Sequence, residues 1–345
     1  MRVLLPLLLL TACTENELGV LTNEEYFEQA SSNAVDILWV IDNSPSMQNE
    51  QAAIAEGAAS FIDHVESTDM DFHIGVIDSD MASDNPNAGK LLGNPTYLHA
   101  GIDGYEDMFR AVVMMDGDGD DKERSFEAAV AALTPPLTST ANFGFLREEA
   151  LLAVIFVSDE NDCSDFGALG PDASGEDCYE QWERLTPVAD IVRMFQDIKD
   201  ENQVILSGIV GPDLTAGCAD SVPGKRYYTA IEMTGGVNAS VCSSDYAAVM
   251  DALGLVASGI QTVFPLEKNA KEDTIEVWVK EGEGDFDEGD KVTKDATNGW
   301  TYIVEYAQIE FHGTAVPPRG SRIKVAYQIA PGAVQVEDTA STSAE

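Results

Sequence analysis

Three oxygen-bearing side chains follow an apolar run near the start of the chain. Asp42 comes directly after the run at 37–41, and Ser44 and Ser46 follow at two-residue spacing, where a helical pattern begins. In an open α/β sheet, ligands bind where a buried strand ends and a helix starts. Carboxylate and hydroxyl oxygens suit Mg²⁺, Mn²⁺ or Ca²⁺ rather than zinc. The sequence therefore predicts a site for a divalent cation at this turn.

The same three residues also fit a helix cap, because Asp, Asn and Ser are preferred at that position. Their place directly after a buried strand favours the metal site. One carboxylate and two hydroxyls put little protein charge on the ion, so it stays electrophilic and keeps positions that an incoming carboxylate can take. A protein or another ligand that offers a carboxylate is therefore the expected partner.

The rest of the chain predicts the scaffold that positions this turn. Between residues 34 and 262, apolar strands alternate with helical stretches, which predicts an α/β domain with a doubly wound, mostly parallel sheet. From 263 to 330, short segments alternate apolar and polar residues between Gly, Pro and Asp. This pattern predicts a small, antiparallel, β-sandwich-like module. We expect residues 331–345 to be a disordered tail.

The D-x-S-x-S motif resembles that of the von Willebrand factor type A (VWA) domain and its metal-ion-dependent adhesion site, in the form found in bacterial lipoproteins. The segment 151–159, Leu-Leu-Ala-Val-Ile-Phe-Val-Ser-Asp, matches the family's fourth strand, and Gly235-Gly236 is similar to the glycine pair after its late helix. The resemblance covers most of 35–262. It implies that Asp159 also faces the metal, and that the ion captures an Asp or Glu of a partner.

One part of the family's pattern is missing. The family supplies a threonine from a middle loop, just before its third helix, and the corresponding loop here, residues 116–124, has no threonine. An aspartate of this loop, Asp118 or Asp120, could supply a carboxylate oxygen instead. The added charge would make the ion less electrophilic and would favour Ca²⁺ over Mg²⁺.

The same acidic loop has two other interpretations. Asp116, Asp118, Asp120 and Glu127 fall at positions 1, 3, 5 and 12 of an EF-hand calcium loop. Asp121 stands where that loop needs a glycine for its sharp turn. A solvated acidic loop without any ligand is the other interpretation.

The start of the chain has the features of a secretory signal over residues 1–12. Arg2 precedes an apolar stretch that is too short to span a bilayer. Leu-Thr-Ala-Cys at 10–13 resembles the lipobox of bacterial lipoproteins, which implies lipidation of Cys13 and a membrane anchor through that lipid. An ordinary secretory signal is the alternative. Residues 13–33 are expected to be a lipidated tether, on a protein exported to the outer membrane or cell surface.

The composition agrees with export. The chain has 61 acidic and 19 basic residues and a formal net charge of −42. Nucleic-acid binding needs basic patches, so this class of function is excluded. The charge itself indicates solubility, and it would also attract divalent cations.

Four cysteines follow Cys13, and an even number in an exported chain indicates disulfides. Of the three possible pairings, Cys163–Cys178 and Cys218–Cys242 close the shortest loops and are the ones we expect. Zinc is the alternative, but no C-x-x-C pair or neighbouring histidine supports it.

Other functions stay open beside a metal-dependent binding protein. An Asp at the end of a first strand also occurs in aspartyl phosphotransferases, but they carry a second acid at the position of Ser44. The chain has no phosphate-binding or dinucleotide-binding glycine motif after a strand. A metal-assisted phosphohydrolase is one alternative, and a structural protein of the cell envelope without a working metal site is another. We expect a binding protein rather than an enzyme.

Overall fold

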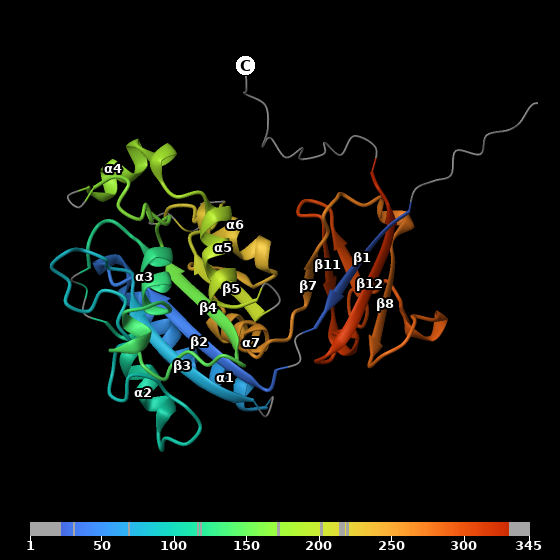
Figure 1. Cartoon of the computed structure of the whole chain (residues 1–345), viewed down its shortest axis with the longest axis horizontal. Helices are drawn as coiled ribbons and strands as arrows, with labels where there is room; N and C mark the ends of the chain where they lie inside the picture. Colours follow the sequence, from blue (N-terminus) through green and yellow to red (C-terminus); the bar gives the residue numbers. More distant parts are fainter. Residues whose placement is uncertain are drawn as a thin grey trace, which may run out of the picture.

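The computed structural model describes an α/β domain beside an antiparallel β module (Figure 1). The predicted signal peptide, Cys13, the tail from 331, and the loop residues Asp116 and Asp118 lie outside the described residues. The described residues are 22–29, 32–67, 70–115, 117, 119–170, 173–200, 203–213, 218 and 221–330.

A parallel sheet of five strands forms the centre of the α/β domain, in the order β3-β2-β4-β5-β6. Two of the inner strands, β4 and β5, are buried at every residue, because helices cover both faces. The α/β class that the sequence predicts is thereby confirmed. The strands are β2 (Ala34–Ile41), β3 (Asp71–Asp78), β4 (Leu151–Ser158), β5 (Val204–Val210) and β6 (Asn238–Ser240).

Helices pack on both faces of this sheet (Figure 1). Alternate side chains of β2 point to opposite faces, so Trp39 packs against Phe61 and Phe109, while Leu38 joins the other core. One face carries α1 (Gln48–Ser67), α2 (Tyr105–Val113) and α7 (Tyr246–Ala257), and the other carries α3 (Ser125–Ala132), α5 (Val188–Ile198) and α6 (Lys225–Thr234). The short helix α4 (Gly175–Glu180) lies in the loop after β4. No helix in the described part of the chain is long and apolar enough to cross a membrane.

The β module consists of two antiparallel sheets, with strand orders β1-β12-β8-β9 and β10-β11-β7. Their inner faces share one apolar core, which includes Phe264, Ile309, Val325 and Tyr327. The strands are β1 (Thr22–Glu28), β7 (Val263–Pro265), β8 (Glu276–Glu281), β9 (Lys291–Val292), β10 (Trp300–Ile303), β11 (Gln308–Phe311) and β12 (Ser321–Gln328).

The prediction of a tether over residues 13–33 is wrong for residues 22–28. These residues form β1, and all seven of them pair antiparallel with β12. The sequence Thr-Asn-Glu-Glu-Tyr-Phe-Glu is polar because only one side of this edge strand meets the core. The α/β domain is therefore inserted between β1 and β7 of the β module (Figure 1).

The two connections between the units are joined by the side-chain amide of Gln29, which bonds to backbone groups of Gln261. Gln29, which is 2 % exposed, donates from Nε2 to the Gln261 carbonyl oxygen (3.0 Å), and its Oε1 accepts from the Gln261 N–H (3.0 Å). Gln29 Nε2 also donates to the Pro317 carbonyl oxygen (2.9 Å). The amide of Gln29 thus links the entry to the α/β domain with the exit from it.

Candidate functional site

The parallel register brings Asp42 and Asp159 to the same edge of the sheet. Asp42 follows β2, Asp159 follows β4, and these two strands are neighbours with Ile41 opposite Val157. Asp42 is fully buried and Asp159 is 7 % exposed. Two acidic residues that are far apart in sequence therefore follow neighbouring strand ends, and the prediction that both face a metal stays a prediction.

The turn after β2 is held in place by hydrogen bonds to Asp42. Its Oδ1 accepts the backbone N–H of Ser44 (2.8 Å), its Oδ2 accepts the hydroxyl of Ser158 (2.7 Å), and its carbonyl oxygen accepts Nε2 of Gln51 from α1 (3.0 Å). The hydroxyls of Ser44 and Ser46 lie 2.9 Å apart. Ser44 makes no side-chain cap hydrogen bond to the helical turn that follows, so the observed contacts do not support the helix-cap interpretation for its hydroxyl.

Asp159 has an oxygen that lacks a partner. Its Oδ1 is buried and accepts no hydrogen bond in the structure, while the Ser46 hydroxyl bonds to the same carboxyl group. Burial raises the pKa of Asp159 to about 6, and the charge of Asp42 adds to the rise. A buried carboxylate oxygen without a donor costs free energy and calls for an explanation such as a bound ion.

A third buried carboxyl group, that of Glu123, was not predicted from the sequence. Glu123 is 2 % exposed and accepts a hydrogen bond from the Ser79 hydroxyl. Burial, and then the charge of Asp42, raise its pKa well above the usual range. Glu123 belongs to the loop that lacks the family's threonine and stands two residues before α3. That position just before the third helix was the signal that could have identified it.

The sequence predicted that Asp118 or Asp120 takes the place of the family's threonine, but the contacts of Asp120 differ from those of Glu123. Asp120 pairs with Arg124 (3.4 Å), and its pKa is raised by burial first and then by hydrogen bonding with Asp121. Asp118 lies outside the described residues. The EF-hand interpretation stays a prediction, although Glu127 accepts the N–H of Phe166 (3.3 Å).

Negative charge is concentrated at this edge of the sheet. Asp42, Glu123, Asp159 and Glu160 all have pKa values raised first by burial, and the last three are raised further by the charge of Asp42. Among the described residues, no three acidic, histidine or cysteine side chains are arranged to hold a metal by themselves. The orphan oxygen, the paired hydroxyls and the mutual repulsion of the carboxyl groups fit a divalent cation.

The loops that carry Asp159 and Glu123 are fastened to each other. The Cys163–Cys178 disulfide closes the loop after β4, and the Cys163 N–H donates to the Glu123 carbonyl oxygen (2.6 Å). In the same loop, Asp162 is fully buried and pairs with Arg226 of α6 (3.1 Å). These contacts hold in place the two loops that carry the carboxyl groups of Asp159 and Glu123.

Both predicted disulfides are confirmed. Besides Cys163–Cys178, the structure joins Cys218 to Cys242, with their Cα atoms 5.6 Å apart. The two bridges rule out the zinc alternative at these cysteines, because a disulfide sulfur carries no thiolate to bind a metal.

The similarities that comparisons with known proteins find for this chain are distant. No family model and no curated protein matches it. Among solved structures, a pilus adhesin, SpaC from Lactobacillus rhamnosus GG, has 12 % identity and a TM-score of 0.42, over 89 % of this chain and 42 % of that one. Two crystal structures of proximal thread matrix protein 1 from the mussel byssus have 12 % and 13 % identity and TM-scores of 0.38 and 0.37.

These two structures are covered over 52 % and 51 % of their length, and they match 71 % and 72 % of this chain. The chain therefore spans about half the length of the solved structures that it matches. Likeness this distant does not identify a function. The parallel five-stranded sheet with helices on both faces is consistent with the VWA fold.

Proposed function

We propose that this chain is a metal-dependent binding protein of the cell exterior, which captures a carboxylate on a protein or another acidic ligand. The buried, unpartnered Oδ1 of Asp159, beside the buried carboxyl of Asp42, is the observation that carries the proposal. A cation at this point would give that oxygen a partner and would offset both the burial of the two carboxyl groups and the charge of Asp42 that adds to the raised pKa of Asp159.

Five side chains would hold the ion. Asp42, Asp159 and Glu123 would supply carboxylate oxygens, and Ser44 and Ser46 hydroxyls, after a rearrangement on binding, because the described residues hold no three acidic, histidine or cysteine side chains already placed around one point. When bound, the metal would act as a Lewis acid toward the oxygen of an incoming carboxylate.

The identity of the metal follows from the charge of these ligands. Asp42 and Asp159 give two carboxylates, and Glu123 adds a third where the resembling family has a neutral threonine. A higher ligand charge favours Ca²⁺ over Mg²⁺. The higher ligand charge also makes the ion less electrophilic, so the ion would bind the captured carboxylate more weakly.

The location of the protein is part of the same proposal. The two disulfides suit an oxidising compartment. Lipidation of Cys13 would anchor the chain to the outer membrane or cell surface, so the metal edge would meet partners outside the cell. The net charge of −42 is unsuited to nucleic acid, and it would concentrate divalent cations near the site.

Isothermal titration calorimetry tests the metal site. Mg²⁺, Mn²⁺ and Ca²⁺ are titrated into the chain after removal of metal with a chelator, and one ion is expected to bind per chain. Asp42→Asn should abolish this binding. Asp107→Asn, on the exposed side of α2, is the matched control and should bind as the wild type does. Equal metal uptake by wild type and Asp42→Asn would overturn the assignment.

A second measurement tests the capture of a carboxylate. A fluorescent peptide that contains a single Asp is titrated into the metal-loaded chain, with the matching Asn peptide as control. The Asp peptide should bind only with metal present, and its binding should be lost in Asp42→Asn. Equal binding of both peptides, or binding that persists in excess chelator, would contradict a metal-mediated mechanism.

A further inference from the structure

The outer face of the four-stranded sheet in the β module carries a row of aromatic and basic side chains. In the strand register, Tyr26 lies opposite Lys324, Lys324 opposite Trp278, and Trp278 opposite Lys291. Successive residues of a strand point to opposite faces, and Val325, next to Lys324, belongs to the core. The four side chains of the row therefore share the face that points away from the core.

The basic groups of this row lie over the aromatic rings. Lys324 Nζ is 5.9 Å from the ring centroid of Tyr26 and 5.1 Å from that of Trp278, and Lys291 Nζ is 5.4 Å from the Trp278 ring. These contacts hold the side chains in place along a line that crosses all four strands. With neighbouring strands about 4.8 Å apart, the line is about 14 Å long, which is enough for a short oligosaccharide.

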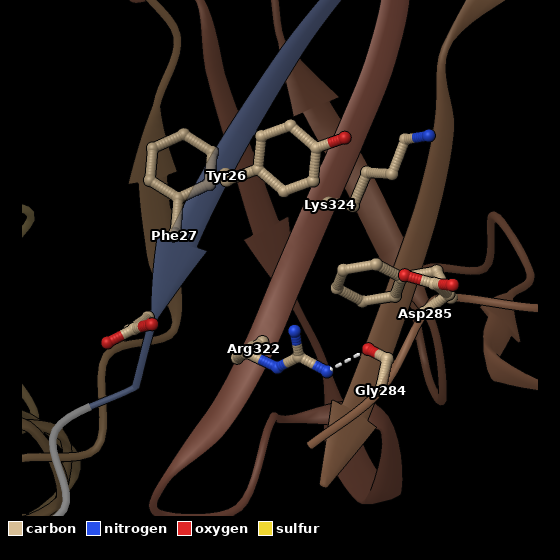
Figure 2. A pocket seen from close by; sticks show the side chains of 8 residues that line it. Tyr26, Phe27, Gly284, Asp285, Arg322 and Lys324 are labelled. Carbon is tan, nitrogen blue, oxygen red and sulfur yellow. Dashed lines mark hydrogen bonds between the residues drawn. The ribbon is translucent and has the colours of Figure 1, made fainter. Parts of the chain in front are cut away.

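A hollow of about 600 Å³ lies beside this row, between β1, β12 and the loop after β8 (Figure 2). Phe286 of that loop forms one wall, with its ring centroid 6.3 Å from that of Tyr26 and 5.3 Å from the guanidinium carbon of Arg322. Figure 2 shows the Tyr26 ring and the Lys324 side chain at one end of the hollow and Arg322 at the other. Tyr26 is 60 % exposed. A large aromatic side chain this exposed, in a walled hollow, is typical of a binding surface.

The charges of this face are balanced within the protein. Lys324 Nζ pairs with Glu24 (2.7 Å) and Lys291 Nζ with Glu276 (2.5 Å), while Arg322 Nε donates to the Gly282 carbonyl oxygen (3.1 Å). An anionic polymer would have to displace these carboxylates, and it would also meet the field of a chain with net charge −42. A neutral ligand meets neither obstacle.

We propose that this face of the β module binds a neutral saccharide chain. The flat CH faces of pyranose rings would pack on Tyr26 and Phe286, the two aromatic residues that line the hollow, where apolar area is buried against aromatic rings. Sugar hydroxyls both donate and accept, so they would bond to the ammonium groups of Lys324 and Lys291 and to the carboxylates of Glu24 and Glu276 that pair with them. This surface lies in the β module and is independent of the metal site in the α/β domain.

Affinity electrophoresis of the full chain tests this binding. Native gels contain a β-glucan, a galactomannan or a dextran, with alginate as the anionic comparison and a gel without polysaccharide as the reference. Wild type should be retarded in at least one neutral gel, equally with and without chelator. Tyr26→Ala and Phe286→Ala should each weaken the retardation about 2- to 10-fold, because each removes one stacking ring.

Tyr306→Ala is the matched control, because Tyr306 is 49 % exposed in the same module but lies outside this face. It should be retarded as wild type is. Melting temperatures of all three variants establish that the module stays folded, and Phe286→Ala changes a loop rather than a strand. Three outcomes would overturn the proposal: no retardation in any neutral gel, retardation that both ring variants keep, or retardation by alginate alone that salt removes.

Discussion

The carboxyl group of Glu123 is buried close enough to that of Asp42 for the charge of Asp42 to raise its pKa, after burial itself. Two neighbouring carboxyl groups away from water cannot both be ionised at low cost, so without a cation the pair of Asp42 and Glu123 retains a proton. A divalent ion between them would replace that proton. Metal binding and proton binding therefore compete at this pair.

Replacing Glu123 by threonine should change which metal the site prefers. Glu123→Thr restores the neutral oxygen of the resembling family and removes one ligand charge, so affinity for Ca²⁺ should fall about tenfold or more relative to that for Mg²⁺. Calorimetric titration of both ions gives this ratio. Glu180→Thr, an exposed residue at the end of α4, is the control. A ratio equal to that of wild type would exclude Glu123 as a ligand.

The stability of the metal-free protein should depend on pH through Asp159. Its folded-state pKa is raised to about 6, so its stabilising contribution is complete at low pH and is lost as the pH rises through 6. At pH 7.5, metal-free Asp159→Asn should therefore melt at a higher temperature than wild type, and the difference should shrink at pH 5. Asp36 and Asp78 also have pKa values raised to about 6, but both residues are present in wild type and in the variant. Their contributions to the pH dependence therefore cancel in the difference between the two melting temperatures.

Saturating metal should reverse this order. The bound ion needs an ionised Asp159, so wild type should then be the more stable protein at pH 7.5 and should lose stability as the pH falls through 6. Thermal melts with and without Ca²⁺, at both pH values, measure the four combinations. If Asp159→Asn melts below wild type without metal at pH 7.5, the raised pKa is not present in the folded protein.

Loss of Arg226 should be strongly destabilising. Asp162 is fully buried and pairs with Arg226, whose Nη2 also donates to the Thr186 carbonyl oxygen (2.8 Å). Arg226→Ala would leave a buried charge without its partner, which costs about 3–5 kcal/mol. Arg193→Ala, which removes an exposed pair with Asp190, should cost less than about 1 kcal/mol. Urea denaturation of both variants tests the difference, and similar losses would contradict it.

Removal of the Cys163–Cys178 disulfide should affect both stability and metal binding. The bridge closes a loop with a sequence separation of 15, so the double serine variant should lose about 3 kcal/mol. Its metal affinity should also fall, because the Cys163 N–H holds the backbone of Glu123. Double replacement of Cys218 and Cys242 is the comparison, and it should lower stability with less effect on metal. Equal losses of metal affinity in the two double variants would show that the Cys163–Cys178 bridge has no special role in metal binding.

Truncation should show that β1 belongs to the β module. A variant that begins at residue 32 lacks the strand that pairs with β12 along seven residues, and it lacks the buried amide of Gln29. We expect proteolysis within residues 264–330, while the α/β domain stays resistant. A variant that begins at residue 22 keeps both features and is the control. Equal resistance of the two variants would mean that β1 contributes nothing to the module.

Parts of this fold could be predicted because the signal is local. The run at 151–157 is apolar throughout, and the run at 34–41 is apolar apart from Asp36, as is usual for strands covered on both faces, and the alternation with helices gives the α/β class. The cysteine pairing followed from the shortest loops. The strand β1 was missed because its sequence is acidic, and its partner β12 lies about 300 residues away in the sequence.

The sequence alone determined which chemistry stands at the end of the first parallel strand: one carboxylate and two hydroxyls, followed by a helix. It also determined the class of the sheet and the disulfides, because each depends on residue type and spacing along the chain. Only the tertiary structure decided that Glu123 is the third carboxyl group at this edge. Many acids in that loop look alike in sequence, and burial beside Asp42, which depends on how the loops pack, separates Glu123 from the others.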